Sequence, residues 1–211
     1  MHYGSFDDAA REYVIDTPYT PLPWINYLGN EDFFGLISNT AGGYDFYRDA
    51  KLRRITRYRY NGVPGDNGSR SYYIAAVGDA GTPECVWSPA FLPTATPLDR
   101  YRCRHGLGYS VFEASCHGVD TELTAFVPMH MNAEVNRLTL RNSSPTAQVL
   151  DVTGCAEWCL WNAEDDASNF QRNLSTGEVE IERDADRTLL YHKTEYRERR
   201  NHYAFFGVNH E

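Results

Sequence analysis

The sequence lacks both a long apolar run and an export signal. No apolar stretch approaches the roughly 18 residues that a membrane-spanning helix needs, and the N-terminal segment MHYGSFDDAAREY is too polar for a signal-peptide core. Basic side chains are also in short supply, since 20 Lys and Arg stand against 29 Asp and Glu, a net charge of −9 with neutral histidines. A surface of that sign repels phosphate backbones. We therefore expect a soluble, cytoplasmic protein that binds neither membranes nor nucleic acid.

Cysteine is sparse and its spacing follows no known pattern. The chain has five, an odd number without paired or zinc-binding spacing: Cys85, Cys103, Cys116, Cys155 and Cys159. In a protein without an export route we expect free thiols that are buried like small apolar side chains. The sequence also lacks a P-loop, a dinucleotide-binding fingerprint and a Ser-His-Asp arrangement. No metal site and no cofactor is predicted.

Aromatic residues, in contrast, are abundant: 15 Tyr, 10 Phe and 4 Trp make up 14% of the chain. Such side chains favour half-buried pleated surfaces, although they also line sites for sugar rings. Short apolar and aromatic stretches alternate with turn residues, and long stretches with helical periodicity are missing. This pattern predicts an all-β sandwich or barrel, with strands expected at Tyr13–Ile15, Trp24–Leu28, Gly35–Ser38, Tyr44–Tyr47, Ser71–Val77, Tyr109–Cys116, Val119–Val127, Ala133–Arg141, Gln148–Leu160, Val179–Glu182, Thr188–His192 and Tyr203–Val208.

Two connections predict antiparallel hairpins. His117-Gly118 separates two alternating stretches, and a two-residue connection that ends in glycine suits a tight primed turn. Asn142-Ser-Ser-Pro-Thr is expected to join two further long strands in the same way. The sequence ends just after the apolar strand at Tyr203–Val208, which would leave a sheet edge open. We therefore expect a sandwich that is truncated before its last strands.

Three charged or polar segments allow more than one interpretation. The run Lys51–Tyr60 (KLRRITRYRY) could bind phosphates, neutralise the acidic surplus or face a sugar, and the negative net charge favours neutralisation. His105 in RHGLGYS could be a catalytic base, but without an identified nucleophile a structural histidine is favoured. The acidic run from Glu164 through Asp165 to Asp166 could serve a glycosidase or a hard cation, while a solvated turn is the simpler interpretation.

The segment Asn169–Asn173 (NFQRN) carries a clearer indication of carbohydrate binding. Its aromatic ring is bracketed by amides and a planar guanidinium, which make directional hydrogen bonds to vicinal hydroxyls while a ring covers the apolar face of a sugar. The alternative is a β-turn in which the amides bond to the turn itself. From the residues alone, the sequence predicts a β-rich domain with a candidate carbohydrate surface.

Several long motifs carry a resemblance to a known family: PWINYLGN, GGYDFYRDAKLRR, RHGLGYS and EWCLWNAEDDASNFQRN. Along essentially its whole length the sequence resembles the N-terminal part of cellobiose phosphorylases, which are glycoside phosphorylases of glycoside hydrolase family 94. The resemblance implies that residues 1–211 form a large antiparallel β-sandwich of the supersandwich type. A helical linker and a catalytic (α/α)6 barrel would follow that domain in the full protein.

The resemblance also implies an activity, the inverting and reversible phosphorolysis of cellobiose to α-glucose 1-phosphate and glucose by a cytoplasmic homodimer. The ligands would be a disaccharide and inorganic phosphate, which is a substrate, so no cofactor is implied. In this family the general acid and the phosphate-binding residues belong to the barrel. We therefore expect no catalytic residue in this chain, and no activity from the chain alone.

One residue is implied to contact substrate. Arg172 matches a family arginine that binds the sugar of the acceptor subsite, and Phe170 and Gln171 are its neighbours in the same loop. Two other functions stay open, namely a free-standing carbohydrate-binding module and a domain that only holds a dimer together. The choice between cellobiose and laminaribiose, and the role of Lys51–Tyr60, are also open.

Overall fold

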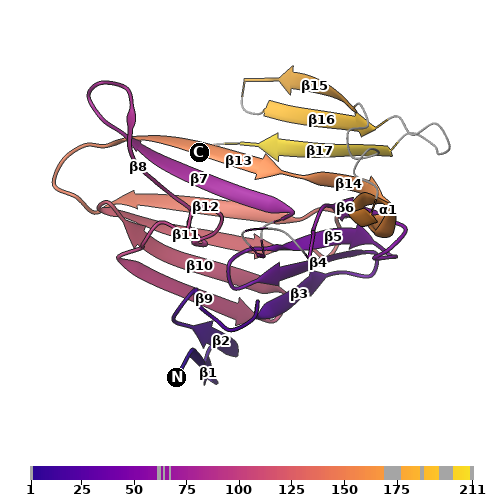
Figure 1. Cartoon of the computed structure of the whole chain (residues 1–211), viewed down its shortest axis with the longest axis horizontal. Coiled ribbons are helices and arrows are strands. Elements are labelled where there is room, and N and C mark those ends of the chain that lie inside the picture. Colours follow the sequence, from indigo (N-terminus) through magenta and orange to yellow (C-terminus); the bar gives the residue numbers. More distant parts are fainter. Residues whose placement is uncertain are drawn as a thin grey trace.

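The structure of the protein, a computed structural model, describes residues 2–60, 63, 65–66, 68–168, 177–185, 188–194 and 202–209. Over these residues the chain forms 17 strands and one helix of six residues, α1 (Ala163–Ser168), and each pair of neighbouring strands runs antiparallel (Figure 1). This confirms the predicted all-β class. In the described part of the chain, no helix has the length and apolarity needed to cross a membrane.

The largest sheet has six strands, and their order in space is β1-β2-β9-β10-β11-β12. Its central strands alternate buried and partly exposed side chains, which is the pattern of a sheet with one face against the core. The strand bounds are β1 (Gly4–Asp7), β2 (Glu12–Ile15), β9 (Arg100–Gly106), β10 (Tyr109–Cys116), β11 (Val119–Phe126) and β12 (Val135–Asn142).

A five-stranded sheet packs against this sheet and encloses the main core. Its order is β14-β6-β5-β4-β3, and its strands are β3 (Ile25–Gly29), β4 (Phe33–Ser38), β5 (Gly43–Tyr47), β6 (Arg54–Thr56) and β14 (Trp158–Trp161). Side chains from both sheets meet in one buried cluster, which includes Ile15, Leu28, Ile37, Phe112 and Leu123. Each such side chain contributes about 1.5–3 kcal/mol to stability when it is fully buried, so this cluster holds the two sheets together as a sandwich.

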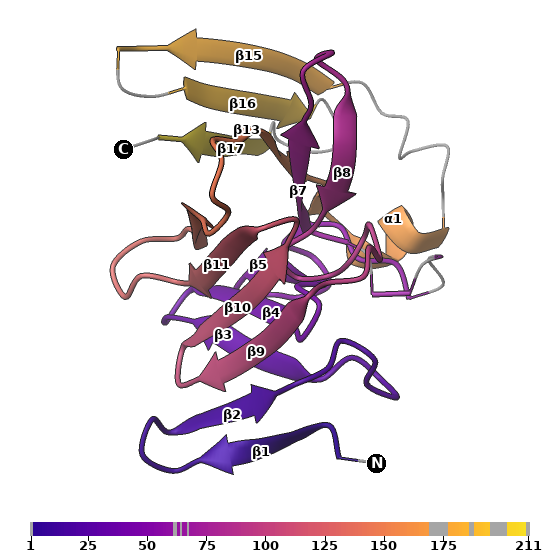
Figure 2. The ribbon, with the colours of Figure 1, turned by 90° about the vertical axis from the view of Figure 1, so that its left-hand side faces the viewer.

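Two three-stranded sheets extend the sandwich (Figure 2). The first has the order β13-β7-β8, with β7 (Arg70–Val77), β8 (Pro83–Trp87) and β13 (Val149–Ala156). Trp87 and Ile74 of this sheet form a second buried cluster with Cys116 and Val119 from the β10–β11 turn. The other sheet contains β15 (Gly177–Arg183), β16 (Thr188–Thr194) and β17 (His202–Val208), and β17 contacts β14.

The structure confirms one of the two predicted hairpins and corrects the other. His117 and Gly118 both have positive φ angles, 51° and 72°, and Cys116 pairs with Val119 across the turn. The Asn142-Ser-Ser-Pro-Thr segment does not form a hairpin, because β12 lies in the six-stranded sheet whereas β13 pairs with β7. The polar groups of this segment bond locally, for example Asn142 Nδ2 to the Thr146 carbonyl at 2.8 Å, and the chain turns a corner between two sheets.

The predicted strand Gln148–Leu160 is two strands in two different sheets. At the junction, the Glu157 N–H donates to the Ser69 carbonyl (2.9 Å), and the Arg57 N–H donates to the Glu157 carbonyl (2.8 Å). These two bonds fasten Glu157 to the segment between β6 and β7, so the chain leaves one sheet there and enters the other. No local sequence signal marks such a junction, because both halves have strand composition.

The cysteines are all free, as expected, but their burial is not uniform. Cys103 and Cys116 are buried, Cys85 and Cys159 are half-buried, and Cys155 is exposed on β13. The expectation that all five are buried is therefore wrong. Four strands also escaped the sequence analysis, because they are short or rich in charged residues: β1, β6, β8 and β9.

Candidate functional site

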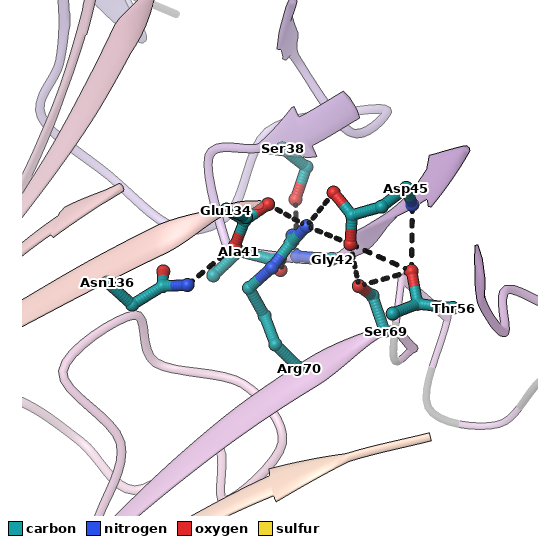
Figure 3. A network of polar contacts seen from close by, with 9 residues as sticks. All are labelled: Ser38, Ala41, Gly42, Asp45, Thr56, Ser69, Arg70, Glu134 and Asn136. Atoms are coloured by element: carbon teal, nitrogen blue, oxygen red, sulfur yellow. Dashed lines mark hydrogen bonds and ion pairs between the residues drawn. The ribbon is translucent and has the colours of Figure 1, made fainter. Parts of the chain in front are cut away.

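A buried network of charged side chains lies where β5, β7 and the segment before β12 meet (Figure 3). Arg70 donates from Nη2 to both carboxylate oxygens of Asp45, at 3.0 and 3.1 Å, and it also forms an ion pair with Glu134. The three side chains are only 5–7% exposed. Asn136 Nδ2 donates to Glu134 Oε1 at 2.7 Å. One guanidinium thus bonds to two carboxyl groups that are both buried.

Hydroxyl groups complete the hydrogen bonding of Asp45. Thr56 Oγ1 and Ser69 Oγ lie 2.9 and 3.2 Å from Asp45 Oδ2, and the Asp45 N–H donates to Thr56 Oγ1 at 2.7 Å. Gly35 on β4 lies close to the Asp45 carboxylate, since a Cβ added at Gly35 would stand 2.7 Å from Asp45 Oδ1. The close approach of backbone and carboxylate therefore requires glycine at this position.

Local sequence patterns do not predict this network, because its members lie far apart along the chain. Arg70 and Glu134 are separated by 64 positions, and neither stands in a recognisable motif. A charged residue at the start of an otherwise aromatic and apolar strand, as in RSYYIAAV, is the one local signal that could have directed attention to Arg70.

The network makes stability depend on pH in a defined direction. In the folded protein, burial and the neighbouring Asp45 raise the pKa of Glu134 to about 8, although Arg70 opposes the shift. Because the unfolded chain releases this proton at lower pH, it binds fewer protons than the folded chain between about pH 5 and pH 8. The stabilising contribution of Glu134 to the free energy of unfolding is therefore expected to decrease as the pH rises through that interval. Glu134→Gln removes the titrating group.

Urea denaturation at several pH values tests this prediction. The stability of Glu134→Gln relative to the unsubstituted protein should rise between pH 5 and pH 8. Glu31→Gln, at an exposed position, is the matched control and should show no such trend. If the difference in free energy of unfolding between Glu134→Gln and the unsubstituted protein is constant over this range, the assigned direction of the Glu134 pKa shift is wrong.

The acidic run at 164–166 forms part of helix α1 and is not a solvated turn. Asn162 caps the helix, since its Oδ1 accepts from the Glu164 and Asp165 N–H groups at 3.0 and 3.2 Å. Asp166 is buried and receives a two-pronged contact from Arg57, with Nη2 to Oδ1 at 2.8 Å and Nε to Oδ2 at 3.0 Å. The favoured interpretation of a solvated turn is therefore wrong for Asp166, whose carboxylate docks the helix on the end of β6.

The Lys51–Tyr60 run supplies the other side of this contact. Lys51 forms an exposed ion pair with Glu164, and the Lys51 carbonyl accepts from the Ala163 N–H at 2.8 Å. Arg54 lies over the ring of Tyr44, with 3.5 Å between the guanidinium carbon and the ring centroid. The interpretation in which basic residues neutralise acidic ones is confirmed for Lys51 and Arg57.

His105 is a structural residue, as the sequence analysis favoured. Its Nε2 lies 3.0 Å from the Trp24 carbonyl, and its Nδ1 lies 2.9 Å from Ser110 Oγ. A carbonyl can only accept, so Nε2 carries the proton and Nδ1 accepts from the serine hydroxyl. Burial lowers the pKa of His105, which favours this neutral form. The side chain thereby ties β9 and β10 to the segment that leads into β3.

Arg172, the residue implied to contact the acceptor sugar, and its neighbours Phe170 and Gln171 lie outside the described residues. The structure describes helix α1, which precedes these residues and ends at Ser168. The ion pair between Asp166 and Arg57 fixes this helix next to β6. In the described part of the chain, no group of three or more His, Cys, Asp or Glu side chains is placed to hold a metal ion.

Comparison with curated proteins finds disaccharide phosphorylases. The chain is 36% identical over 176 residues to an N,N'-diacetylchitobiose phosphorylase of Vibrio proteolyticus, covering 82% of this chain and 21% of that protein. It is 35% identical over 197 residues to an N,N'-diacetylchitobiose phosphorylase of Vibrio furnissii, covering 92% and 24%. A 3-O-beta-D-glucopyranosyl-beta-D-glucuronide phosphorylase of Paenibacillus borealis is 33% identical over 150 residues, covering 71% and 18%. The chain thus spans about a fifth to a quarter of the length of these relatives.

A family model supports the same relationship over nearly the whole chain. The model described as the supersandwich domain of glycosyl hydrolase 94 matches residues 11–211. The match agrees with the antiparallel sandwich of the structure and with the family resemblance of the sequence motifs, although it does not distinguish cellobiose phosphorylases from other members. The chain therefore belongs to the glycosyl hydrolase 94 family and carries its supersandwich domain.

Proposed function

We propose that residues 1–211 are the N-terminal β-sandwich domain of an inverting disaccharide phosphorylase, followed in the full protein by a helical linker and a catalytic (α/α)6 barrel. The observation that carries this proposal is the family match over residues 11–211, together with relatives that are themselves disaccharide phosphorylases. In the proposed enzyme this domain contributes to the acceptor sugar subsite. The complete protein is proposed to be a cytoplasmic homodimer that uses a disaccharide and inorganic phosphate and needs no cofactor.

The proposed reaction is a single displacement at the anomeric carbon. A phosphate oxygen attacks C1 of the sugar on the face opposite the glycosidic bond, that bond breaks, and a carboxylic acid transfers its proton to the leaving oxygen. The products are an α-sugar 1-phosphate and a free sugar. Phosphate is already an anionic nucleophile, so a second carboxylate to activate water is not required. Both the acid and the phosphate-binding residues are proposed to lie in the barrel, so the 211-residue chain alone should be inactive.

Three substrates are candidates. The two Vibrio relatives favour N,N'-diacetylchitobiose as the first compound to test. Cellobiose is the candidate from the sequence motifs, and laminaribiose differs from it in the linkage alone. The choice among the three sugars is proposed to depend largely on the barrel side of the acceptor subsite.

Phosphate-dependent cleavage by the full-length protein tests the proposal. The protein is incubated with each of the three disaccharides, with and without phosphate, and the products are followed by phosphorus and proton NMR. We expect an α-sugar 1-phosphate from one of them, in amounts equal to the free sugar, and no cleavage without phosphate. Hydrolysis without phosphate, a β-anomeric product, or full activity of the 211-residue chain alone would each contradict the proposal.

A further inference from the structure

The N-terminal hairpin borders an open groove of about 880 Å³. One wall is the turn between β1 and β2, and the opposite wall is formed by Pro23–Asn26 and by the β9–β10 turn at His105–Leu107. The hairpin lies at one edge of the six-stranded sheet, well away from helix α1 in both views (Figures 1 and 2). The groove is therefore separate from helix α1.

The floor of the groove is fixed by hydrogen bonds that leave it little freedom. Glu12 is buried and bonds to Arg104 Nη1 at 2.8 Å and to the Tyr109 hydroxyl at 2.7 Å. Asn26 Nδ2 donates to the carbonyls of Gly106 and Tyr109, both at 2.9 Å. A surface with these bonds is preorganised, so a ligand would not have to order it.

The rim, in contrast, offers groups that have no charged partner. Asp7, Asp8 and Arg11 are exposed, and none of them takes part in an ion pair with any residue that the structure describes. Asp7 Oδ1 accepts from the Ala10 N–H at 3.0 Å, which leaves its other oxygen free. Two carboxylates and one guanidinium can bond to neutral hydroxyls, but their net negative charge disfavours an anionic ligand.

Apolar side chains stand beside these charges. Phe6 is 80% exposed and rests edge-on against Tyr13, with ring centroids 4.8 Å apart, while Tyr13 in turn contacts Trp24 at 5.8 Å. Leu107 on the opposite wall is 82% exposed. The edge-on contact with Tyr13, which itself rests against Trp24, supports Phe6 at the groove, where its ring can cover the apolar face of a pyranose.

We propose that this groove is a second, non-catalytic binding site for an uncharged β-linked oligosaccharide. Phe6 packs against one sugar ring, while Asp7, Asp8 and Arg11 bond to the hydroxyls. The β-linkage rests on the proposed function, whereas the preference for an uncharged sugar follows from the groove itself. Phe6, Asp7 and Asp8 precede the residues that match the family model.

Calorimetric titration of the 211-residue chain tests the site in buffer without phosphate. The probes are cellotetraose and tetra-N-acetylchitotetraose, with a heparin tetrasaccharide as the anionic comparison. We expect saturable binding of at least one neutral probe and none of the heparin fragment. Phe6→Ala should weaken binding about three- to tenfold, the loss expected for one aromatic contact. Phe205→Ala on β17, which removes another exposed ring (61% exposed), is the matched control and should change nothing.

Several outcomes would overturn the site. The proposal is wrong if neither neutral probe binds, if heparin binds more tightly, or if Phe6→Ala and Phe205→Ala have the same effect. The proposal is also wrong if the protein binds no sugar and sedimentation shows that it self-associates, with the association lost in Phe6→Ala. The groove would then be a contact between two copies of the chain. Because phosphorolysis by the full-length protein is assayed separately, a failure of the groove and a failure of the proposed reaction are distinguishable.

Discussion

Replacing Arg172 by alanine in the full-length protein is expected to weaken the binding of the acceptor sugar by about ten- to 150-fold. This is the loss expected when a charged donor no longer bonds to a neutral hydroxyl, roughly 1.5–3 kcal/mol. Binding of the sugar 1-phosphate should be nearly unchanged, because the proposed contact is with the acceptor alone. Kinetics in the synthesis direction, with the two substrates varied separately, measure both constants.

The conservative variant and a matched control make the Arg172 experiment decisive. Arg172→Lys should recover only part of the lost affinity, because an ammonium cannot reproduce the planar fork of a guanidinium. Arg141→Ala removes an exposed arginine on β12 and should leave both Michaelis constants unaltered. If Arg172→Ala raises the Michaelis constants of both substrates together, or leaves both unchanged, Arg172 is a surface or scaffold residue and the proposed contact does not exist.

Removal of the Arg70 guanidinium is expected to cause the largest loss of stability. In Arg70→Ala, the Asp45 carboxylate stays buried without a countercharge beside Glu134, which is mainly protonated at pH 7. Breaking a buried ion pair from one side in this way costs about 3–5 kcal/mol. A domain of this kind is stable by about 5–15 kcal/mol in total, so the variant should unfold at a much lower urea concentration. The free energy of unfolding from urea titration at pH 7 is the measurement.

Two further variants separate the buried charge from a general effect of losing an arginine. Arg48→Ala breaks an ion pair with Asp32 in which the arginine is 56% exposed, and it should cost much less stability than Arg70→Ala because solvent screens an exposed pair. Arg70→Met combined with Asp45→Asn removes the guanidinium together with the carboxylate charge that it balances, and this double variant should be more stable than Arg70→Ala. An Arg70→Ala variant that loses no more stability than Arg48→Ala would show that the network is not a significant source of stability.

Local patterns in the sequence predict those features that depend on neighbouring residues. The β10–β11 hairpin is an example, because alternating side chains on both sides and a His-Gly turn specify strands, register and connection together. The same holds for the assignment of His105 as structural and for the free state of the cysteines. The connection from β12 to β13 has equally good turn residues, yet its strands enter different sheets. The residues of a turn do not indicate whether the two strands that it joins pair with each other or enter different sheets.

By itself, then, the sequence determined the all-β class, most of the strands and the family, since these depend on residue type, periodicity and long contiguous motifs. Only the tertiary structure decided that the strand up to Leu160 divides at Glu157, that Asp166 is a buried partner of Arg57, and that Arg70 joins Asp45 to Glu134. Each of these contacts joins segments that are distant in the chain. Their partners are set by the packing of whole sheets, which excludes water and forces every buried charge to find an opposite charge.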